Sequence, residues 1–343
     1  MRTTIKILFG LSSVLAMSAV ASAATLMPIV PYPGATTTSV FGIADDNNTI
    51  TGSYVDANGL THGFYGTLDG NYTSFDFGNS GATQARAIDS TGTIITGFAN
   101  ISADHCSFEE FEKEGSNPAR AIKWDGTPLN GEAQGLNTRG RFAGDYCDLA
   151  GSGTIYGMGG HGRKYRRTVS TPFQSSYTGE RAVNNNSTFA GFYIDDSIGY
   201  QVGTLIVAGK TQQIVYPDDT QLYTVLEGLN NAGMASGQWG DSNGITHSFS
   251  YDSTTGTFVE IDDPNAGSFT QAWGVNNNGL IAVTSDAGAY IYCPDDNNCP
   301  GNGAKIAVHR ISSTAAMRHT NAQKKSWHAV PPQHKLPKGA AVQ

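Results

Sequence analysis

Two histidines occupy matching positions in the sequence, each shortly after an Asn-Gly turn. They are His62 in Thr61-His62-Gly63-Phe64 and His247 in Thr246-His247-Ser248-Phe249. An imidazole can act as a general acid or base, or bind a metal ion. Because each His precedes an aromatic residue in a recurring frame, we interpret both as structural groups that hydrogen-bond to the backbone. The two lie four repeat units apart, so they cannot share one local metal site.

A second candidate set is one variable position in a frame that repeats six times. Each frame holds a small residue followed by an aliphatic one, and the residue just before the small one differs between copies. These six residues are Phe41, Arg86, Gln134, Arg181, Glu227 and Trp273. Aromatic, cationic and amide groups together suit a sugar or another small polar ligand, so we predict that they ring a central channel. Ordinary packing between imperfect copies is the alternative.

The sequence contains no established catalytic motif. There is no G-x-S-x-G, no H-E-x-x-H and no Cys–His signature of a nucleophilic enzyme. A carboxylate pair for glycoside hydrolysis stays open, since its geometry depends on distance in space. The Asp/Asn turns at residues 45–48 and 295–298 lack the Gly and Glu of an EF-hand loop. We therefore expect Asx turns there, no metal site and no cofactor.

The frame defines six repeat units. Its small residues are spaced by 45, 48, 47, 46 and 46 positions, and they are Gly42, Ala87, Gly135, Ala182, Gly228 and Gly274. A second small residue closes a short apolar run in each unit, at Gly52, Gly97, Gly144, Gly191, Gly237 and Ala282. Periods of this length are typical of propellers, solenoids and other repeat arrays.

Each unit has the alternating pattern of strands. In the first unit we expect strands a to d at residues 39–43, 49–55, 61–68 and 72–77. Four strands per unit match a propeller blade better than an open solenoid or stacked sandwiches. The sixth unit lacks an evident strand d, whereas residues 26–35 align with the strand-d exit at 258–266. We therefore predict an all-β, six-bladed propeller of four-stranded antiparallel blades, closed by the N-terminal strand.

Both ends differ from the repeat region, which spans residues 24–303. Residues 1–23 have the charged start, apolar stretch and Ala-x-Ala site of a signal peptide, with cleavage after Ala23. The apolar stretch is short for a membrane span, so we expect a secreted or periplasmic protein without one. Residues 304–343 hold seven Lys or Arg and no acidic residue, and we expect a basic, disordered tail.

Four cysteines remain after the signal peptide. Cys293 and Cys299 flank a short polar loop, which leaves Cys106 to pair with Cys147. An oxidising compartment favours disulfides, whereas zinc would need closer spacing or a nearby His. The formal net charge of −8 argues against a nucleic-acid partner, whose phosphates require a basic surface.

Two units depart from the regular pattern. Residues 100–118 form an acidic insertion between strands b and c of the second unit, with carboxylates at Asp104, Glu109, Glu110, Glu112 and Glu114. The third unit has a Gly-rich stretch and then the basic run 163–167. We expect that run to be a solvated strand c facing the acidic insertion, with binding of an anionic ligand as the alternative.

The units around His62 and His247 resemble bacterial extracellular repeats of the HAF type. Those repeats contain an N-x-x-G-x-I-x-G strand, a D-x-x-G-x-x-H-x-F hairpin and an F-x-x-I-D-x-P-G-A exit. Residues 257–264 match the exit element. The resemblance covers roughly residues 33–292 and is strongest in units one and five. It implies export and a repeat-built β fold, and no established reaction. Four units lack the His, so no role for a histidine ring carries over.

These patterns predict an exported, non-enzymatic propeller that acts as a monomer. We expect it to bind a glycan, a cell-envelope component or a protein partner on one face. The rival hypothesis is a secreted glycan-active hydrolase or lyase with carboxylates around the channel. A purely structural envelope protein is a third possibility.

Overall fold

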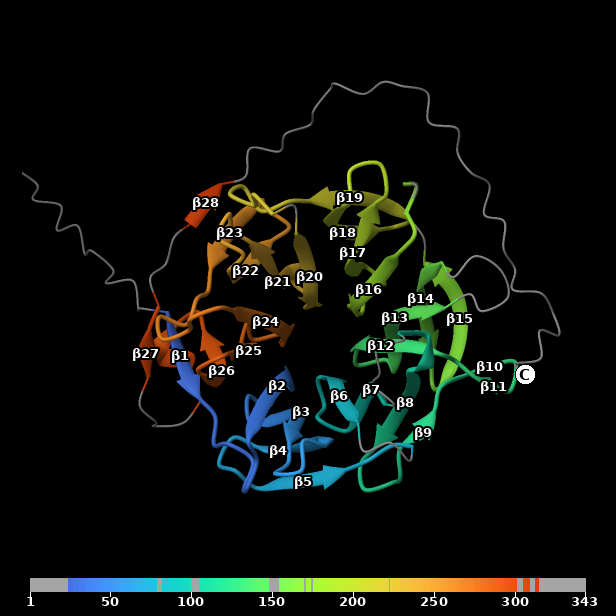
Figure 1. Cartoon of the computed structure of the whole chain (residues 1–343), viewed down its shortest axis with the longest axis horizontal. Coiled ribbons are helices and arrows are strands. Elements are labelled where there is room, and N and C mark those ends of the chain that lie inside the picture. The colour runs from blue at the N-terminus through green and yellow to red at the C-terminus, as the bar shows by residue number, and fades with distance from the viewer. Residues whose placement is uncertain are drawn as a thin grey trace, which may run out of the picture.

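Six small β-sheets surround a central axis as the blades of a propeller (Figure 1). The computed structural model describes residues 24–78, 82–99, 105–147, 154–169, 171–173, 175–221, 223–300, 305–308 and 312–314. Within these ranges the only helical segments are the short turns η1 (His105–Ser107) and η2 (Asp296–Asn298), and no helix there is long and apolar enough to span a membrane. The predicted all-β, six-bladed architecture is confirmed.

The first three blades follow one another along the chain. Blade one contains β2 (Thr37–Ile43), β3 (Thr49–Val55), β4 (Thr61–Thr67) and β5 (Tyr72–Phe75). Blade two contains β6 (Thr83–Ile88), β7 (Ile94–Ala99), β8 (Glu109–Glu114) and β9 (Arg120–Ala121). Blade three contains β12 (Gly131–Leu136), β13 (Arg141–Cys147), β14 (Ile155–His161) and β15 (Lys164–Val169), extended outwards by β10 (Lys123–Trp124) and β11 (Thr127–Pro128).

The other three blades complete the ring. Blade four contains β16 (Thr178–Val183), β17 (Phe189–Asp195), β18 (Tyr200–Val207) and β19 (Lys210–Ile214). Blade five contains β20 (Thr224–Leu229), β21 (Met234–Gly240), β22 (Thr246–Asp252) and β23 (Thr257–Glu260). Blade six contains β24 (Thr270–Val275), β25 (Ile281–Ser285) and β26 (Gly288–Cys293) from the C-terminal side of the repeat region.

The fourth strand of blade six comes from the other end of the chain, as predicted. Strand β1 (Thr25–Pro28) runs antiparallel to β26, with Leu26 opposite Tyr292 and Pro28 opposite Tyr290 (Figure 1). Leu26 is fully buried. The pairing uses backbone groups that an open array would leave exposed at the edge of the last blade.

Two short segments of the tail also form strands, which corrects the prediction of disorder for those residues. Strand β27 (Ile306–Ala307) pairs with β1, and β28 (Ser312–Thr314) pairs with β23 of blade five. Both extend a blade at its outer edge, where unpaired backbone groups can accept one more strand. The rest of the tail, the signal peptide and its cleavage site lie outside the described residues.

The acidic insertion is shorter than predicted. Strand β8 pairs along its whole length with β7, so it is strand c of blade two and not part of a loop. Its sequence, Glu-Glu-Phe-Glu-Lys-Glu, hides the strand pattern because charged residues occupy two buried positions, Glu110 and Lys113, on opposite faces of the strand. The insertion was predicted to be too long because a sequence does not show which charged side chains become buried; that depends on the strands packed around them.

The basic run of blade three is also displaced from its predicted place. Strand c is β14, and the basic residues occupy the following turn and β15, which is strand d. The predicted proximity to acidic residues does hold at one point, because Arg163 Nε lies 3.6 Å from Glu112 Oε1 of blade two.

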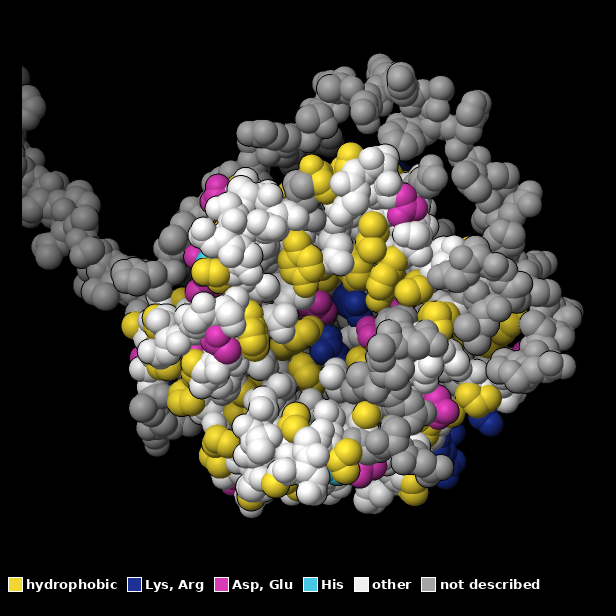
Figure 2. Space-filling view, viewed as in Figure 1, with side chains coloured by type: hydrophobic (Ala, Val, Ile, Leu, Met, Phe, Trp, Pro, Cys, Tyr) yellow, Lys and Arg dark blue, Asp and Glu magenta, His cyan; other side chains and the backbone are white. Residues whose placement is uncertain are grey.

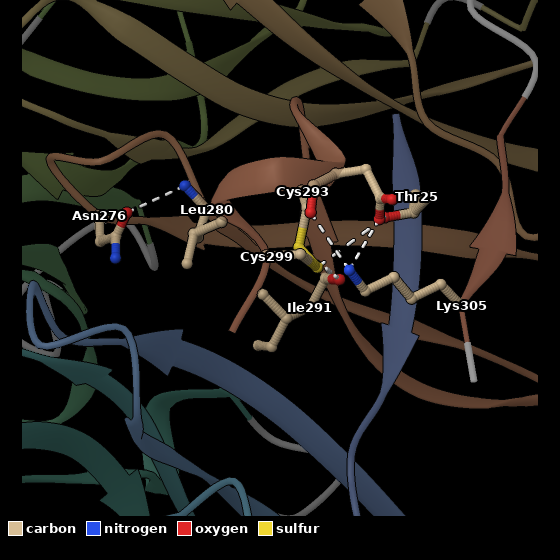
Figure 3. The surroundings of a disulfide bond; sticks show 8 residues. Thr25, Asn276, Leu280, Ile291, Cys293, Cys299 and Lys305 are labelled. Atoms are coloured by element: carbon tan, nitrogen blue, oxygen red, sulfur yellow. Dashed lines mark hydrogen bonds and ion pairs between the residues drawn. A yellow bond between two sulfur atoms is a disulfide. The ribbon is translucent and has the colours of Figure 1, made fainter. Parts of the chain in front are cut away.

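Both predicted disulfides are present. Cys106–Cys147 joins η1 to the end of β13, and Cys293–Cys299 closes the loop after β26. Figure 3 shows the second bond beside β1, where Thr25 Oγ1 lies 3.8 Å from Cys299 Sγ. There, Lys305 Nζ lies 2.8 Å from Asp296 Oδ1, so the C-terminal segment is tied to the disulfide loop.

Candidate functional site

Strand a of every blade carries an irregularity in its pairing with strand b at the same place. In blades one to five a single residue is skipped in the register, and in blade six the irregularity spans Trp273 and Gly274. The irregular positions hold the six variable residues: Phe41, Arg86, Gln134, Arg181, Glu227 and Trp273. A β-bulge releases one residue from the ladder and redirects its side chain. The variable residues are therefore released from pairing in every blade.

The second small residue is explained by the same bulge in blades one to five; blade six, where the irregularity is wider, has Ala282 instead of Gly. A Cβ added at Gly52, Gly97 or Gly144 would lie 2.0, 1.9 or 2.1 Å from the carbonyl oxygen of the strand-a residue two positions before the bulged one. Real Cβ atoms do not approach an oxygen so closely. Strand b therefore needs Gly where the bulge brings the two backbones together, because only Gly lacks a Cβ.

The first small residue lets the six inner strands converge on the axis. A Cβ on Gly135 would lie 2.5 Å from Ala182 Cα, and one on Gly228 would lie 2.5 Å from the carbonyl oxygen of Trp273. Both clashes are with strand a of the next blade. These residues are small because neighbouring blades approach each other so closely around the channel.

All six variable residues line one end of the central channel, a region that we call the charged ring. The cavity there has a volume of about 60 Å³, enough for a few water molecules. Figure 2 looks into the hollow at the centre of the disc, where Lys or Arg and Asp or Glu side chains lie inside a rim of hydrophobic ones. The predicted position of the six residues around the channel is thus observed.

Arg181 is surrounded by carboxylates from blade three. Its Nη1 donates to Glu132 Oε2 at 2.5 Å and lies 3.9 Å from the fully buried Asp145 Oδ2. Tyr177 joins the group, since its hydroxyl donates to Asp145 at 3.2 Å. Burial works to lower the pKa of Arg181, but Tyr177, Glu132, Glu227 and Asp145 raise it well above its usual range. Arg181 is thus a firmly held ion-pair partner.

Arg86 has a weaker set of partners. Its Nε donates to the neutral amide of Gln134 at 2.7 Å, and its nearest carboxylate, Glu227, is 3.7 Å from Nη2. The guanidinium lies 4.0 Å from the ring centroid of Trp273 and 4.5 Å from that of Phe41. Burial lowers the pKa of Arg86 to about 10, and Glu227 only partly offsets it. Its positive charge is therefore incompletely compensated.

Three further acids around the ring have raised pKa values. Burial raises the pKa of Glu227, against the opposing effect of Arg181 and Arg86. Burial also raises the pKa of Glu180 to about 8 and that of Glu110 well above its usual range. Glu180 and Glu110 are fully buried, and their carboxyl oxygens have no hydrogen-bond partner among the described residues. Burial thus favours the neutral form of both carboxyl groups.

The opposite end of the channel is lined by amides, and we call it the asparagine ring. An aliphatic layer that contains Ile43, Ile88 and Leu136 separates it from the charged ring. Asn137, Asn184, Asn230 and Asn276 each donate from Nδ2 to a backbone carbonyl of the next blade, at 2.9, 3.2, 3.1 and 2.9 Å. Their Oδ1 atoms accept two backbone N–H bonds of their own turns. Both functional groups of each amide are satisfied within the fold.

The two histidines lie away from the channel, between strands c and d of their blades. His62 Nδ1 contacts Asp76 Oδ1 at 2.9 Å, and His247 Nδ1 contacts Asp262 Oδ2 at 2.5 Å. The other ring nitrogen of each lies 3.6 Å from an Asp of the preceding turn, Asp56 or Asp241. The partners of both imidazoles are carboxylates and not the backbone groups that the sequence suggested.

Several residues of the charged ring were missed by sequence reasoning. Glu132 and Tyr177 lie near the start of strand a, or just before it, and Gln238 comes from strand b, where it donates to Glu227 Oε1 at 3.2 Å. Glu132 and Gln134 are two residues apart in one strand, a spacing that places side chains on one face. That spacing is the signal in the sequence that could have placed Glu132 beside Gln134.

Comparisons with known proteins inform the fold alone. No protein-family model matches the chain, and neither does any curated protein. Among solved structures, TolB from Acinetobacter baumannii is 13% identical over 77% of this chain and 66% of its own, with a TM-score of 0.50. A fucose-specific lectin from Aleuria aurantia is 14% identical over 75% of this chain and 91% of its own, at 0.45.

The chain spans a smaller part of another similar structure. A prolyl endopeptidase is 13% identical over 76% of this chain but only 39% of its own, with a TM-score of 0.46. A shared fold does not determine a shared function, so these likenesses carry no function over to this chain. What the chain and these structures have in common is the β-propeller.

Proposed function

We propose that the protein is an exported, non-enzymatic binding module whose charged ring engages a polar group of a glycan. One observation carries this proposal: Arg86 is buried beside Trp273 with its charge incompletely compensated. An anionic group on the ligand, such as the carboxylate of an acidic sugar, would supply the missing partner. Trp273 Nε1, which is buried and has no hydrogen-bond partner among the described residues, would donate to the same ligand.

The size of the cavity limits how the ligand binds. A volume of about 60 Å³ admits a carboxylate or a hydroxyl group but not a whole sugar ring. The sugar would therefore rest on the rim of the channel and insert a single polar group. Aromatic and cationic side chains around a small polar pocket are a usual composition for sites of this kind.

Titration calorimetry with two matched oligosaccharides tests the proposal. Oligogalacturonate carries a carboxylate on each sugar, and the same oligomer with methyl-esterified carboxylates does not. We expect the acid form to bind at least tenfold more tightly, and Arg86→Gln to abolish the difference. Equal affinity for both forms, or a difference that survives in Arg86→Gln, would reject the anionic contact; no binding across a broad glycan array would reject glycan recognition itself.

The enzyme hypothesis keeps one supporting observation. Glu227 lies in the channel with a raised pKa, as a general acid requires. A Glu227→Gln variant separates the two functions, because an enzyme would lose turnover while retaining its ligand. Under our proposal the unmodified protein releases no product from any polysaccharide that it binds, and measurable turnover that Glu227→Gln removes would overturn the non-enzymatic assignment.

Export and the HAF-type resemblance enter the proposal as predictions. The two disulfides support an oxidising compartment, since such bonds are rare in the cytosol. Mass spectrometry of the mature protein would test cleavage after Ala23. A cell-envelope component or a protein partner would be sought by the same binding experiments if no glycan binds.

A further inference from the structure

The outer rim of blade five contains a group of metal-ligating side chains that the charged ring does not use. His247, Glu260 and Asp262 each offer one donor atom, and the three atoms lie within 4.8 Å of one another. His247 lies on strand c (β22), Glu260 ends strand d (β23), and Asp262 follows two residues later. We infer that they form a binding site for a divalent transition-metal ion of the Zn²⁺ type, with three protein ligands.

The donor set fits such an ion chemically. One imidazole nitrogen and two carboxylate oxygens are donors that Zn²⁺ accepts, and sites with three protein ligands leave a fourth position for water. His247 and Asp262 are 21% and 28% exposed in their side chains, so an ion can reach them from solvent. Nδ1 of His247 already faces Asp262, and binding would replace the proton between these two groups with the metal.

The surrounding residues hold the three ligands in position. The Trp239 ring stacks on the imidazole at a centroid distance of 4.6 Å, and Asp241 Oδ2 lies 3.6 Å from Nε2. A carboxylate beside the second ring nitrogen fixes the tautomer of metal-bound histidines. Tyr216 donates its hydroxyl hydrogen to Glu260 Oε2 at 3.1 Å, and Asp262 Oδ1 accepts the Ser248 N–H at 3.1 Å.

Blade one is a natural control inside the same chain. It repeats the arrangement with His62, Asp76 and Asp56 at comparable distances. The register of strands c and d pairs Phe64 with Ser74, as it pairs Phe249 with Glu260, so Ser74 stands in the position of Glu260. Asp76 and Asp56 face opposite ring nitrogens of His62, so among the residues described no three donor atoms there lie within 4.8 Å of one another. We therefore assign the metal to blade five and none to blade one.

Zinc titration of the full chain, followed by calorimetry, tests the assignment. We expect His247→Gln and Glu260→Ser each to remove the same single equivalent of bound Zn²⁺, or to weaken it at least tenfold. Glu260→Ser reproduces the residue found in blade one, so it should leave the fold intact, which near-UV circular dichroism will check. Co²⁺ should give a d–d absorption band that the same two variants lose.

Histidines elsewhere in the chain do not confuse the result, because zinc bound by them would persist in both variants. A Ser74→Glu variant should gain one further equivalent, since it supplies the third donor in blade one. If the unsubstituted chain and Glu260→Ser bound zinc with equal stoichiometry and affinity, the three-ligand site would be wrong. Binding of no zinc at millimolar concentration would also overturn it.

Discussion

The two ends of the channel are built by the same six strands, yet they treat their polar groups differently. In the asparagine ring, one residue type recurs in four consecutive blades, and each amide bonds to its own turn and to the next blade. In the charged ring, five residue types occupy six equivalent positions, and some polar groups find no partner among the described residues. The repeated asparagines thus satisfy their hydrogen bonds within the fold, whereas the varied residues of the charged ring leave polar groups that a ligand could contact.

The two arginines sharpen this contrast within the charged ring itself. Arg181 has one close carboxylate, Glu132 at 2.5 Å, and a second, Asp145, at 3.9 Å, whereas the one carboxylate near Arg86 is Glu227 at 3.7 Å. The other contacts of Arg86 are with an amide and two aromatic rings. Equivalent positions in equivalent strands therefore have different roles. Arg181 stabilises the ring, and Arg86 is the residue that we assign to the ligand.

The largest expected effect tests that division. Arg181→Met should lower the free energy of unfolding by about 3–5 kcal/mol, because it removes the ion-pair partner of two buried carboxylates. Arg86→Met should lower it by only about 1–2 kcal/mol, because it removes one hydrogen bond to the neutral amide of Gln134 and a longer contact with Glu227, whose pKa is already raised. Guanidinium unfolding measures both values. Equal losses of unfolding free energy in the two variants would show that Arg86 and Arg181 do not differ in their structural role.

The pH dependence of stability probes the buried acid beside Arg181. The folded-state pKa of Glu180 is about 8, above its ordinary value of 4.5, so between these values the native state binds a proton that the unfolded chain has released. Stability should fall as pH rises through this window, with a slope of at most about 1.4 kcal/mol per pH unit. Glu180→Gln should flatten the profile. An unchanged profile would mean that Glu180 is ionised in the native state.

A smaller loss is expected where the blades meet between the two rings. Gly135→Ala should lower the free energy of unfolding by about 1–3 kcal/mol, because the new methyl group meets the backbone of blade four. Gly267→Ala is the matched control, since its Cβ would have only one neighbour, at 3.4 Å. Thermal melts of the pair would show whether close approach, and not glycine itself, is what the repeat requires.

The smallest effect is expected in the asparagine ring. Asn184→Ala removes one bond to blade five and two within its own turn, so we expect a loss of about 1–2 kcal/mol. Ligand affinity should stay within twofold of the unsubstituted protein, since the aliphatic layer separates the two ends. Asn186→Ala, at the exposed neighbouring position, should change neither property. A large loss of binding in Asn184→Ala would mean that the two ends are coupled.

Much of the candidate site was predictable, for a physical reason. The position of Phe41, Arg86 and their four counterparts follows from the repeat, because equivalent residues of equivalent blades must lie at equivalent distances from the axis. The bulge that releases these side chains was not predictable, since it is a property of the pairing between two strands. The strand nature of β8 was missed because its buried Glu110 and Lys113 look like surface residues in a sequence.

The histidines show the same limit. Spacing located His62 and His247 beside a turn, but their carboxylate partners lie just after the end of the next strand, 14 or 15 residues away. Glu260 became a candidate metal ligand only from the register of strands c and d, which pairs it with Phe249. Ser74 holds the equivalent position in blade one, where it pairs with Phe64. The prediction that the chain has no metal site was made without that neighbour, and our inference departs from it there.

The sequence by itself determined the number of blades, their strand order and the origin of the closing strand, because period and turn chemistry are local properties that repeat. It also determined which position varies. Only the tertiary structure decided what the variable residues do, since the compensation of a buried charge depends on groups from other blades. Arg86 and Arg181 are the same residue in the same frame, and they differ because blade three gives Arg181 carboxylates and gives Arg86 an amide.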